Sequence, residues 1–296
     1  MILVAGSANL DFVVRVPHIP APGETVLGAD FRTYPGGKGA NQAVACARAG
    51  AAATAMLLAL GDDSFAGPIQ HSLREAGVRL HVVHSAGIAT GAAFICVADD
   101  AQNAIAVAPG ANHALLPKHL PPLDGVTHLL LQLEISLDTL LAYAHAAHTC
   151  GIQVVLNAAP ARPLPAALLA SLDMLIVNET ELAMLSGVTH DLERGLAAID
   201  VPCVVATLGQ QGCLARTAGG LLRQPAFPIV PVDTTAAGDT FCGVLVAALS
   251  RGLDLSAALR EASAAAALAC TRAGAQSSIP THAEVRALLQ GGIFGG

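Results

Sequence analysis

The sequence predicts an α/β protein in which helices cover both faces of a doubly wound, mostly parallel sheet. Apolar strand-like runs alternate with alanine-rich helical stretches along most of the chain, an order of elements typical of this three-layer αβα architecture. The composition agrees: 53% of the 296 residues are hydrophobic and only 12% are charged, so the chain can bury a large core.

Six apolar runs are expected to form the main sheet: 2–5, 54–60, 129–133, 153–156, 174–177 and 203–208. Helices are expected at 136–149, 165–171, 238–251, 255–271 and 282–290. Two other regions, about 12–34 and 91–107, combine short half-polar strands with turn residues, and we expect them to pair as a small β lid over the site. Since no repeat or linker marks a boundary, residues 1–296 are expected to form a single domain.

Charge and cysteine content narrow the class of protein. The formal net charge of −7 provides no general attraction to nucleic acid or to an anionic membrane, so any phosphate-binding surface must be local. The seven cysteines are scattered without C-x-x-C or Cys/His ligand spacing, which argues against a disulfide framework and a zinc site. The first apolar run is short and lacks a basic start, unlike a signal peptide, and no run is long enough to cross a bilayer. We therefore expect a cytoplasmic protein.

One segment combines small residues, a helix start and a carboxylate. Ala236, Ala237 and Gly238 lead into an alanine-rich helix, where unpaired backbone N–H groups and the helix dipole would surround a phosphoryl group without interference from side chains. Asp239 follows, placed to accept a proton from an attacking alcohol, as phosphoryl transfer to a hydroxyl requires. The segment predicts a small-molecule kinase. The alternative for Asp239 is an N-terminal cap on a buried helix.

A second glycine cluster, which begins at Gly36, opens another alanine-rich helix far upstream. Two such helix starts suggest two ends of one site. In an open α/β sheet the ligand lies beyond the carboxyl ends of the strands, and this chain carries polar residues directly after several predicted strands, Glu134 and Asn178 among them. Neither glycine cluster matches the P-loop or the dinucleotide-binding pattern, which disfavours ordinary NTPases and dehydrogenases.

Six short motifs together carry a resemblance to a known family. They are G-S-x-N-x-D from Gly6, P-G-E-T from Pro22, G-G-K-G-A-N-Q-A from Gly36, G-D-D-S from Gly61, N-E-T-E from Asn178 and D-T-x-A-A-G-D-T-F from Asp233. On these motifs the chain resembles the ribokinase-like (PfkB) family of carbohydrate kinases. The resemblance implies the ribokinase-like fold, ATP-dependent phosphorylation of D-ribose at O5 with Asp239 as general base, and a homodimer formed through the lid.

The resemblance also implies which residues form each part of the site. The sugar would lie among Asn9, Asp11, Gly37, Lys38, Asn41, Glu134 and Asp239, and carboxylates and amides suit that role because a pentose offers only hydroxyls. ATP would contact Asn178, Thr207, Gly209, Gly212, Gly238 and Ser263, with Asn178 and Glu181 near a hydrated magnesium ion. A monovalent cation, K⁺, would lie beside Asp233, Thr235, Ala269, Arg272, Gly274 and Ser278, mostly on backbone carbonyls.

Several of these residues have plainer interpretations. Without the family, Asp11 would be a solvated turn aspartate and Glu134 a surface glutamate at a helix start. The segment 178–181 would be a helix cap with an acidic first turn, an interpretation compatible with a role near magnesium.

The chain departs from the family pattern at three places. Ser263 stands where a histidine near the nucleotide base is typical, and the segment between Gly187 and Cys203 is shorter than usual. Cys242 stands where asparagine is common; it is either a small packing residue or a thiol activated by the helix start.

Two other functions stay open at this point. A kinase of the same family could act on deoxyribose, another sugar or a nucleoside, although seven phenylalanines, two tyrosines and no tryptophan provide few groups to stack on a base. A non-catalytic sugar-binding protein on the same fold is the second alternative, disfavoured by the intact Asp239 and its small neighbours.

Overall fold

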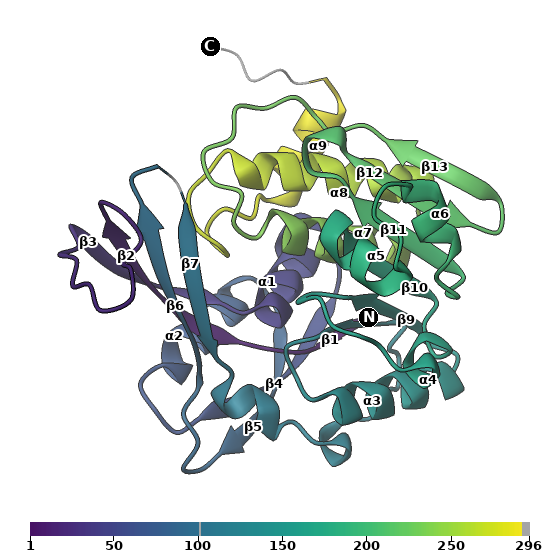
Figure 1. The fold of residues 1–296 in the computed structure, drawn as a ribbon. Helices are drawn as coiled ribbons and strands as arrows, with labels where there is room; N and C mark the ends of the chain where they lie inside the picture. Colours follow the sequence, from purple (N-terminus) through teal and green to yellow (C-terminus); the bar gives the residue numbers. More distant parts are fainter. Residues whose placement is uncertain (101, 292–296) are drawn as a thin grey trace.

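The computed structural model describes residues 1–100 and 102–291. Within them the largest element is a nine-stranded sheet in the order β13-β12-β11-β10-β9-β8-β1-β4-β5 (Figure 1). The strands from β11 to β5 run parallel, and β12 and β13 add an antiparallel edge. The strands are β1 (Ile2–Ala5), β4 (Thr54–Gly61), β5 (Arg79–Ser85), β8 (His128–Gln132), β9 (Gln153–Asn157), β10 (Met174–Asn178), β11 (Cys203–Thr207), β12 (Cys213–Thr217) and β13 (Gly220–Gln224).

Helices pack on both faces, which makes the sheet the middle of three layers. One face carries α1 (Lys38–Val44) with its π-helical continuation η1 (Ala45–Ala49), α2 (Ala66–Glu75), α7 (Ala237–Ser250), α8 (Leu255–Cys270) and α9 (His282–Leu289). The other carries α3 (Leu137–Thr149), α4 (Ala166–Leu169), α5 (Glu179–Ser186) and α6 (Leu192–Ala197). Short 3₁₀ turns lie at η2 (Gly110–Ala114), η3 (Pro117–His119) and η4 (Gly209–Gln211).

The continuous apolar runs follow from this burial on both faces. In β1, Ile2 and Val4 point into the core beneath α7 and α8, whereas Leu3 and Ala5 point into the core above α3. Because both cores exclude water, nearly every residue of such a strand is apolar.

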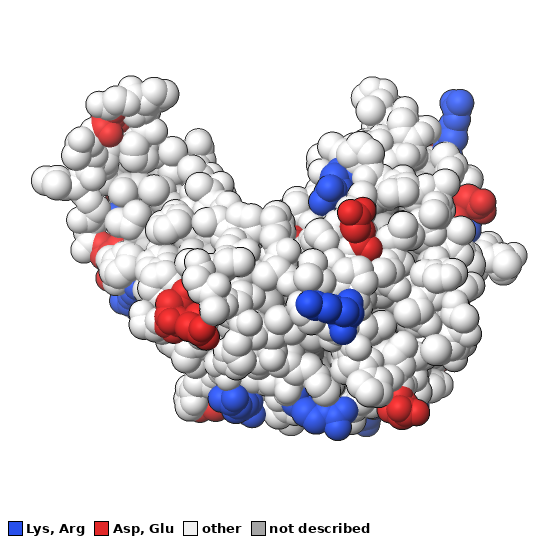
Figure 2. Space-filling view, turned by 90° about the horizontal axis from the view of Figure 1, so that it is seen from below, with Lys and Arg blue, Asp and Glu red and all other residues white. Residues whose placement is uncertain are grey.

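A second sheet of four strands, called the small sheet from here on, stands at one side of the main sheet in the order β3-β2-β6-β7 (Figure 1). It comprises β2 (Asn9–Val16), β3 (Asp30–Gly36), β6 (Gly91–Ala98) and β7 (Asn103–Ala108). Phe12 in β2 stacks on Phe94 with ring centroids 5.3 Å apart and meets Phe65, just before α2, edge-on at 5.1 Å. The contact with Phe65 joins the small sheet to the helical layer. A deep hollow separates its side of the molecule from the opposite side (Figure 2).

The strand order reverses at β1, because β4 and β5 lie on one side of it and β8 to β11 lie on the other. At such a reversal the connections after neighbouring strands diverge and leave a crevice at the carboxyl ends. The turn after β1 contains Ser7, and the turn after β8 contains Glu134. The topology therefore positions a site between these two turns.

The predicted fold class is confirmed, and each of the six predicted main-sheet strands and five named helices is present within one or two residues, except that α4 is shorter than its predicted range. The prediction missed β5, β12, β13 and α2. β5 and β13 are the two edge strands, where residues are half-exposed, and β12 lies next to β13 and ends in the polar Arg216 and Thr217. All three therefore lack the continuous apolar run that marks the central strands. Among the described residues, no helix is both long enough and apolar enough to span a bilayer. The seven cysteines are free thiols.

Candidate active site

Asp239 is buried at the start of α7, where two amides from α1 hold its carboxylate. Asn41 Nδ2 donates to Asp239 Oδ2, and Gln42 Nε2 donates to Oδ1, each over 2.9 Å. The residue at the N-cap of α7 is Ala236, and no side chain caps this helix. The interpretation of Asp239 as a helix cap is therefore wrong: its oxygens are bonded to a different helix, with about 200 residues of chain between them.

Close packing of α1 against α7 makes these bonds possible. Gly243, one turn after Asp239, lies so near α1 that an added Cβ would come within 2.5 Å of the carbonyl oxygen of Gln42. Only a glycine permits this approach. The contact brings the polar residues at the start of α1 within reach of the carboxylate at the start of α7.

A chain of buried amides extends from Gln42 to the ends of β8 and β9, where Asn157 also lines the cavity beside Asp239. Gln42 Nε2 also donates to Asn157 Oδ1 at the end of β9 (3.0 Å), and Asn157 Nδ2 donates to the carbonyl of Ile176 (3.3 Å). Gln132, at the end of β8, donates from Nε2 to Gln42 Oε1 (2.7 Å). Sequence reasoning did not give Gln42 a role, because its partners are about 90 to 200 residues away along the chain.

Glu134 lies at the strand-order reversal, held from both neighbouring turns. Its Oε2 accepts from Ser7 Oγ (2.5 Å) and from the backbone N–H of Lys38 (3.1 Å). Gly37, just before α1, has φ of +86°, and a Cβ there would lie 2.8 Å from the backbone of Ala8. A glycine at this position lets α1 begin against the turn after β1, so that the start of α1 faces Glu134.

The other expected sugar residues lie on β2, at the side of the small sheet. Burial raises the pKa of Asp11 to about 7, with the charges of Glu134 and Asp239 adding to the effect. Asp11 is therefore no solvated turn residue. The Asn9 side chain accepts a hydrogen bond from Asn112 Nδ2 (2.7 Å), and Asn112, which sequence reasoning missed, also accepts from the backbone of Ala8.

Two buried amide oxygens near Asp239, Asn41 Oδ1 and Gln132 Oε1, have no hydrogen-bond partner among the described residues. Asn41 Nδ2 is committed to Asp239, but Asn41 Oδ1 accepts no hydrogen bond from the described protein. Such an acceptor is costly to bury unless a ligand supplies the donor, and a sugar hydroxyl would do so.

A cavity of about 160 Å³ joins the two helix starts; it is lined by Lys38, Asp239, Asn178 and Glu181 among others. The Asp239 carboxylate raises the pKa of Lys38 and outweighs the effect of burial, so the ammonium stays charged. Burial raises the pKa of Glu181. Asn178 and Glu181 cap α5 reciprocally, because Asn178 Oδ1 accepts from Glu181 N and Glu181 Oε2 accepts from Asn178 N, each over 2.8 Å.

The capping box uses Glu181 Oε2, so Glu181 Oε1 is not needed for the cap. Glu181 lines the cavity together with Lys38 and Asp239. A hydrated magnesium ion with phosphate groups needs few protein oxygens, and an acidic side chain at the edge of a small polar cavity suits it. The residues present therefore fit such an ion. Both interpretations of the segment 178–181, as a helix cap and as a neighbour of magnesium, are compatible with this geometry.

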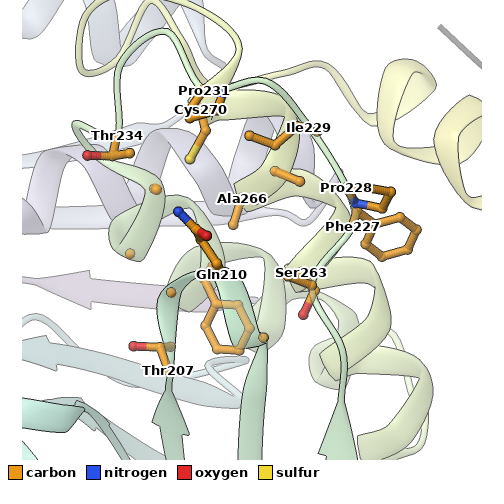
Figure 3. Close-up of a pocket in the computed structure, with 17 residues that line it drawn as sticks. Thr207, Gln210, Phe227, Pro228, Ile229, Pro231, Thr234, Ser263, Ala266 and Cys270 are labelled. Carbon is orange, nitrogen blue, oxygen red and sulfur yellow. The ribbon is translucent and has the colours of Figure 1, made fainter.

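A larger cavity of about 690 Å³ adjoins the first, since Thr207 and Gly238 line both. Of the expected ATP residues, Gly209, Gly212 and Ser263 also line it, and α8 contributes Ala266 and Cys270 (Figure 3). The opposite wall is the loop from Phe227 to Pro231, which sequence reasoning missed because it has no helical or strand pattern. A mostly apolar cavity beside a helix N-terminus suits a nucleotide whose phosphates reach the smaller cavity.

The backbone at the start of α7 has unusual features. Ala236 has φ of +58°, a left-handed conformation rare for alanine and often retained at functional sites. Of the three expected N–H donors, that of Ala237 is bonded to the carbonyl of Thr234 at 3.2 Å. Among the described residues, no backbone acceptor pairs with the N–H of Ala236 or Gly238, so these two are the open donors.

The two segments expected to bind a monovalent cation meet in the structure. Asp233 Oδ2 accepts from Gly274 N (2.9 Å), and Asp233 Oδ1 accepts from the backbone and hydroxyl of Thr235. These bonds keep the pKa of Asp233 low despite partial burial. The Arg272 guanidinium pairs with Glu284, which leaves only its backbone for a cation. The place where the two segments meet contains the Asp233 carboxylate and the backbone carbonyls of the two loops, and such oxygen atoms are chemically suited to a monovalent cation.

Cys242 lies beneath the smaller cavity and is buried. Burial raises the pKa of its thiol well above the usual range, and the neighbouring Asp239 carboxylate adds to that effect. A buried thiol with a raised pKa favours the packing interpretation over a thiol activated by the helix start. Cys242 is a packing residue.

Comparisons with known proteins agree with this geometry. The model of the pfkB family of carbohydrate kinases matches residues 1–282. The ribokinase of Bacillus subtilis is 39% identical over 296 residues, which cover 97% of this chain and 99% of that protein. The deoxyribokinase of Salmonella typhi is 33% identical over 293 residues, 95% of each chain. The solved structure of Arabidopsis thaliana ribokinase, complexed with ribose and ATP, matches with a TM-score of 0.90 and 33% identity over 98% of each chain.

Proposed function

This chain belongs to the pfkB family of carbohydrate kinases and is an enzyme of the ribokinase type, and we propose that it transfers the γ-phosphoryl group of ATP to O5 of D-ribose. The observation that carries the proposal is the place of Asp239. Its buried carboxylate lines the cavity between the sugar-side residues and the nucleotide-sized cavity, at the N-terminus of α7.

In this mechanism Asp239 accepts the proton of the attacking hydroxyl as the new O–P bond forms to the γ-phosphorus of ATP, and the bond from that phosphorus to the β–γ bridging oxygen breaks to release ADP. The open N–H groups of Ala236 and Gly238 donate to the oxygens of the transferred phosphoryl group, where negative charge must be stabilised. The N–H of Ala237 can donate to the same phosphoryl oxygens only after its hydrogen bond to the carbonyl of Thr234 breaks. The Lys38 ammonium adds a positive charge at the same cavity.

The sugar is oriented by side chains that recognise hydroxyl groups. Asp11 and Glu134 accept hydrogen bonds from hydroxyls, and the unpaired Asn41 Oδ1 provides a further acceptor. The small sheet acts as a lid, which closes over the sugar and excludes water, and a second copy of the chain pairs with that lid in a homodimer.

Two ions complete the proposal. Asn178 and Glu181 would hold the water ligands of a magnesium ion bound with ATP, which would supply positive charge to the phosphates. The loop of Asp233 and the segment 269–278 would hold K⁺, which would supply a positive charge beside the backbone donors of α7. The reaction takes place in the reduced cytoplasm, a setting supported by the free thiols.

A coupled ATP-to-ADP assay tests the substrate, run with magnesium across D-ribose, 2-deoxy-D-ribose, hexoses and nucleosides. We expect the highest kcat/KM with D-ribose and the 5-phosphate as product. Faster turnover of another acceptor would reassign the substrate, and binding of sugar without turnover of any acceptor would favour a non-catalytic protein. Activity unchanged in K⁺-free buffer would contradict the cation proposal.

The general base is tested by Asp239→Asn. Loss of the proton acceptor is expected to lower kcat by about 10²–10⁴-fold while the Kd for sugar, measured by calorimetry, changes much less. Substantial turnover in this variant would remove Asp239 from the base role.

A further inference from the structure

We propose that Gln42 is a positioning residue for the phosphoryl transfer: Gln132 and Asn157 hold its side-chain amide in one orientation, and through it they hold the carboxylate of Asp239 for proton transfer. The inference rests on the proposed role of Asp239 as the base. Gln42 and Gln132 are fully buried, whereas Asn157 also lines the smaller cavity.

The orientation of the amide chain follows from one backbone carbonyl. The oxygen of Ile176 can only accept, so Asn157 must turn Nδ2 toward it (3.3 Å), which leaves Asn157 Oδ1 facing Gln42. Because Asn157 Oδ1 is an acceptor, the NH₂ group of Gln42 must face it. Gln42 Oε1 then points the other way, where Gln132 Nε2 donates to it over 2.7 Å.

The carboxylate of Asp239 requires the same orientation of the Gln42 amide. An ionised carboxylate only accepts, and Gln42 Nε2 donates to its Oδ1 over 2.9 Å. If the Gln42 amide rotated by half a turn, its oxygen would face two acceptors, Asp239 Oδ1 and Asn157 Oδ1, and lose the bond from Gln132. Asp239, Asn157 and Gln132 can all form their hydrogen bonds with Gln42 in only one orientation of its amide. A glutamine without these partners would not keep that orientation.

Burial separates this role from substrate binding. Gln42 and Gln132 are 0% exposed, so neither can contact a ligand in the cleft. Asn41, which also donates to Asp239, is different, because its own amide oxygen has no partner among the described residues and is available to a ligand. Gln42 therefore binds the Asp239 carboxylate from a position that the substrate cannot reach.

The charges around Asp239 explain why a neutral donor is needed there. Three carboxylates act on this region: Asp11 from β2, Glu134 after β8 and Glu181 from α5. The charged group of opposite sign is Lys38 of α1, and the Cys242 thiol on α7 is buried and protonated. Hydrogen bonds from uncharged amides stabilise the ionised Asp239 carboxylate without adding another ion to the cleft.

The decisive variant is Gln42→Glu, which keeps the size of the side chain but puts a carboxylate against Asp239. Two carboxylates in contact tend to share a proton, so the acid limb of the kcat–pH profile should move up by about one pH unit or more. At pH 7 kcat should fall about 10–100-fold and recover as the pH is raised, whereas KM for the sugar should change less than about threefold.

Gln132→Met provides a second variant in case the new carboxylate prevents folding. It removes the donor to Gln42 Oε1 without adding charge, so the amide of Gln42 is freer to rotate. We expect kcat to fall about 3–10-fold at every pH, with little change in KM. The matched control is Thr139→Val on α3, which removes a buried hydrogen bond to Leu115 O (2.8 Å) outside the site; it should leave kcat and its pH profile unchanged.

The outcomes separate this inference from the proposed function. If Asp239→Asn abolishes turnover but Gln42→Glu and Gln132→Met retain the wild-type kcat and pH profile, Asp239 is the base and the positioning role is wrong. If Asp239→Asn retains turnover, the proposed function itself fails. If the Gln42 and Gln132 variants raised KM by the same factor by which they lowered kcat, and their Tm fell as well, Gln42 would contribute only to folding. That result would also overturn the inference.

Discussion

Ser7 Oγ donates a 2.5 Å hydrogen bond to Glu134 Oε2 and joins the turn after β1 to the turn after β8. These turns flank the reversal of strand order, so the bond spans the crevice that the topology creates. The same Ser7 Oγ accepts from the N–H of Gly39 at 3.3 Å. One hydroxyl therefore links both turns to the start of α1 and holds a carboxylate that we propose to bind the sugar.

Ser7→Ala tests this link. Without the hydroxyl, Glu134 keeps only the Lys38 N–H and becomes free to leave its position. We expect KM for the sugar to rise about tenfold, the effect of losing one hydrogen bond to a charged group, with a smaller change in kcat. Ser250→Ala, which removes a hydroxyl bonded to Ala247 O on the far end of α7, should change neither constant; an equal effect there would contradict the specific role of Ser7.

Gly238→Ala tests the phosphate-binding backbone. A Cβ on Gly238 would meet no atom within 4 Å, so folding does not require the glycine; the methyl group would instead point into open space in a residue that lines both cavities. We expect Tm to stay within about 2 °C and kcat/KM for ATP to fall about 10–100-fold, because the phosphates are displaced.

Gly67→Ala is the matched control for that variant. Gly67 is likewise the second residue of a helix, α2, and its added Cβ also meets nothing within 4 Å. It should leave kinetics unchanged and stabilise the protein slightly, since alanine favours a helix. Equal kinetics for Gly238→Ala and wild type would exclude the N-terminus of α7 as the phosphate site.

The raised pKa of Asp11 predicts a pH-dependent stability. With a folded pKa of about 7 against an ordinary 3.8, the folded protein retains the Asp11 proton longer than the unfolded chain does. The contribution of Asp11 to stability is therefore fully present below pH 3.8 and is lost as the pH rises toward 7.

Asp11→Asn should remove this dependence. The difference in Tm between the variant and wild type should grow in favour of the variant from pH 4 to pH 7 and then level off, reaching about 3 °C or more. Thermal unfolding at several pH values measures it. Asp124→Asn, at an exposed position, is the control. A difference independent of pH would show that Asp11 is ionised in the folded protein throughout this range.

Glu284 predicts the opposite dependence. Its carboxylate accepts from the Arg272 guanidinium and from the backbone and hydroxyl of Thr281, and these bonds lower its pKa to about 2 from 4.5. The stabilisation is present above pH 4.5 and is lost as the pH falls toward 2.

Glu284→Gln keeps an oxygen for the capping box but removes the negative charge that pairs with Arg272, so it should lower Tm at pH 7 by about 1–3 °C, the effect of a partly exposed ion pair of about 0.5–1 kcal/mol, and the deficit should shrink below pH 4.5. Glu193→Gln, in the exposed first turn of α6, provides the comparison and should change Tm little. If the deficit of Glu284→Gln persisted unchanged at pH 3, the charge of Glu284 would not be its cause.

Several parts of the molecule were predictable because they depend on local pattern. Central strands such as β1 and β10 are apolar at nearly every residue, and the starts of α1 and α7 carry small residues that few other helices have. Edge strands such as β13 were missed because their half-exposed residues have no distinctive pattern. The loop from Phe227 was missed for the same reason, although it lines the larger cavity.

Local sequence pattern was enough to predict the layered fold, the two helix starts and the motifs that indicate phosphoryl transfer, because burial on two faces and backbone geometry act through neighbouring residues. The packing of the folded chain was needed to show that Asn41 and Gln42 hold Asp239, that Gln132 and Asn157 orient Gln42, and that Ser7 holds Glu134. These bonds join residues about 90 to 200 positions apart, and their geometry depends on how closely α1 packs against α7 and how the sheet orders its strands.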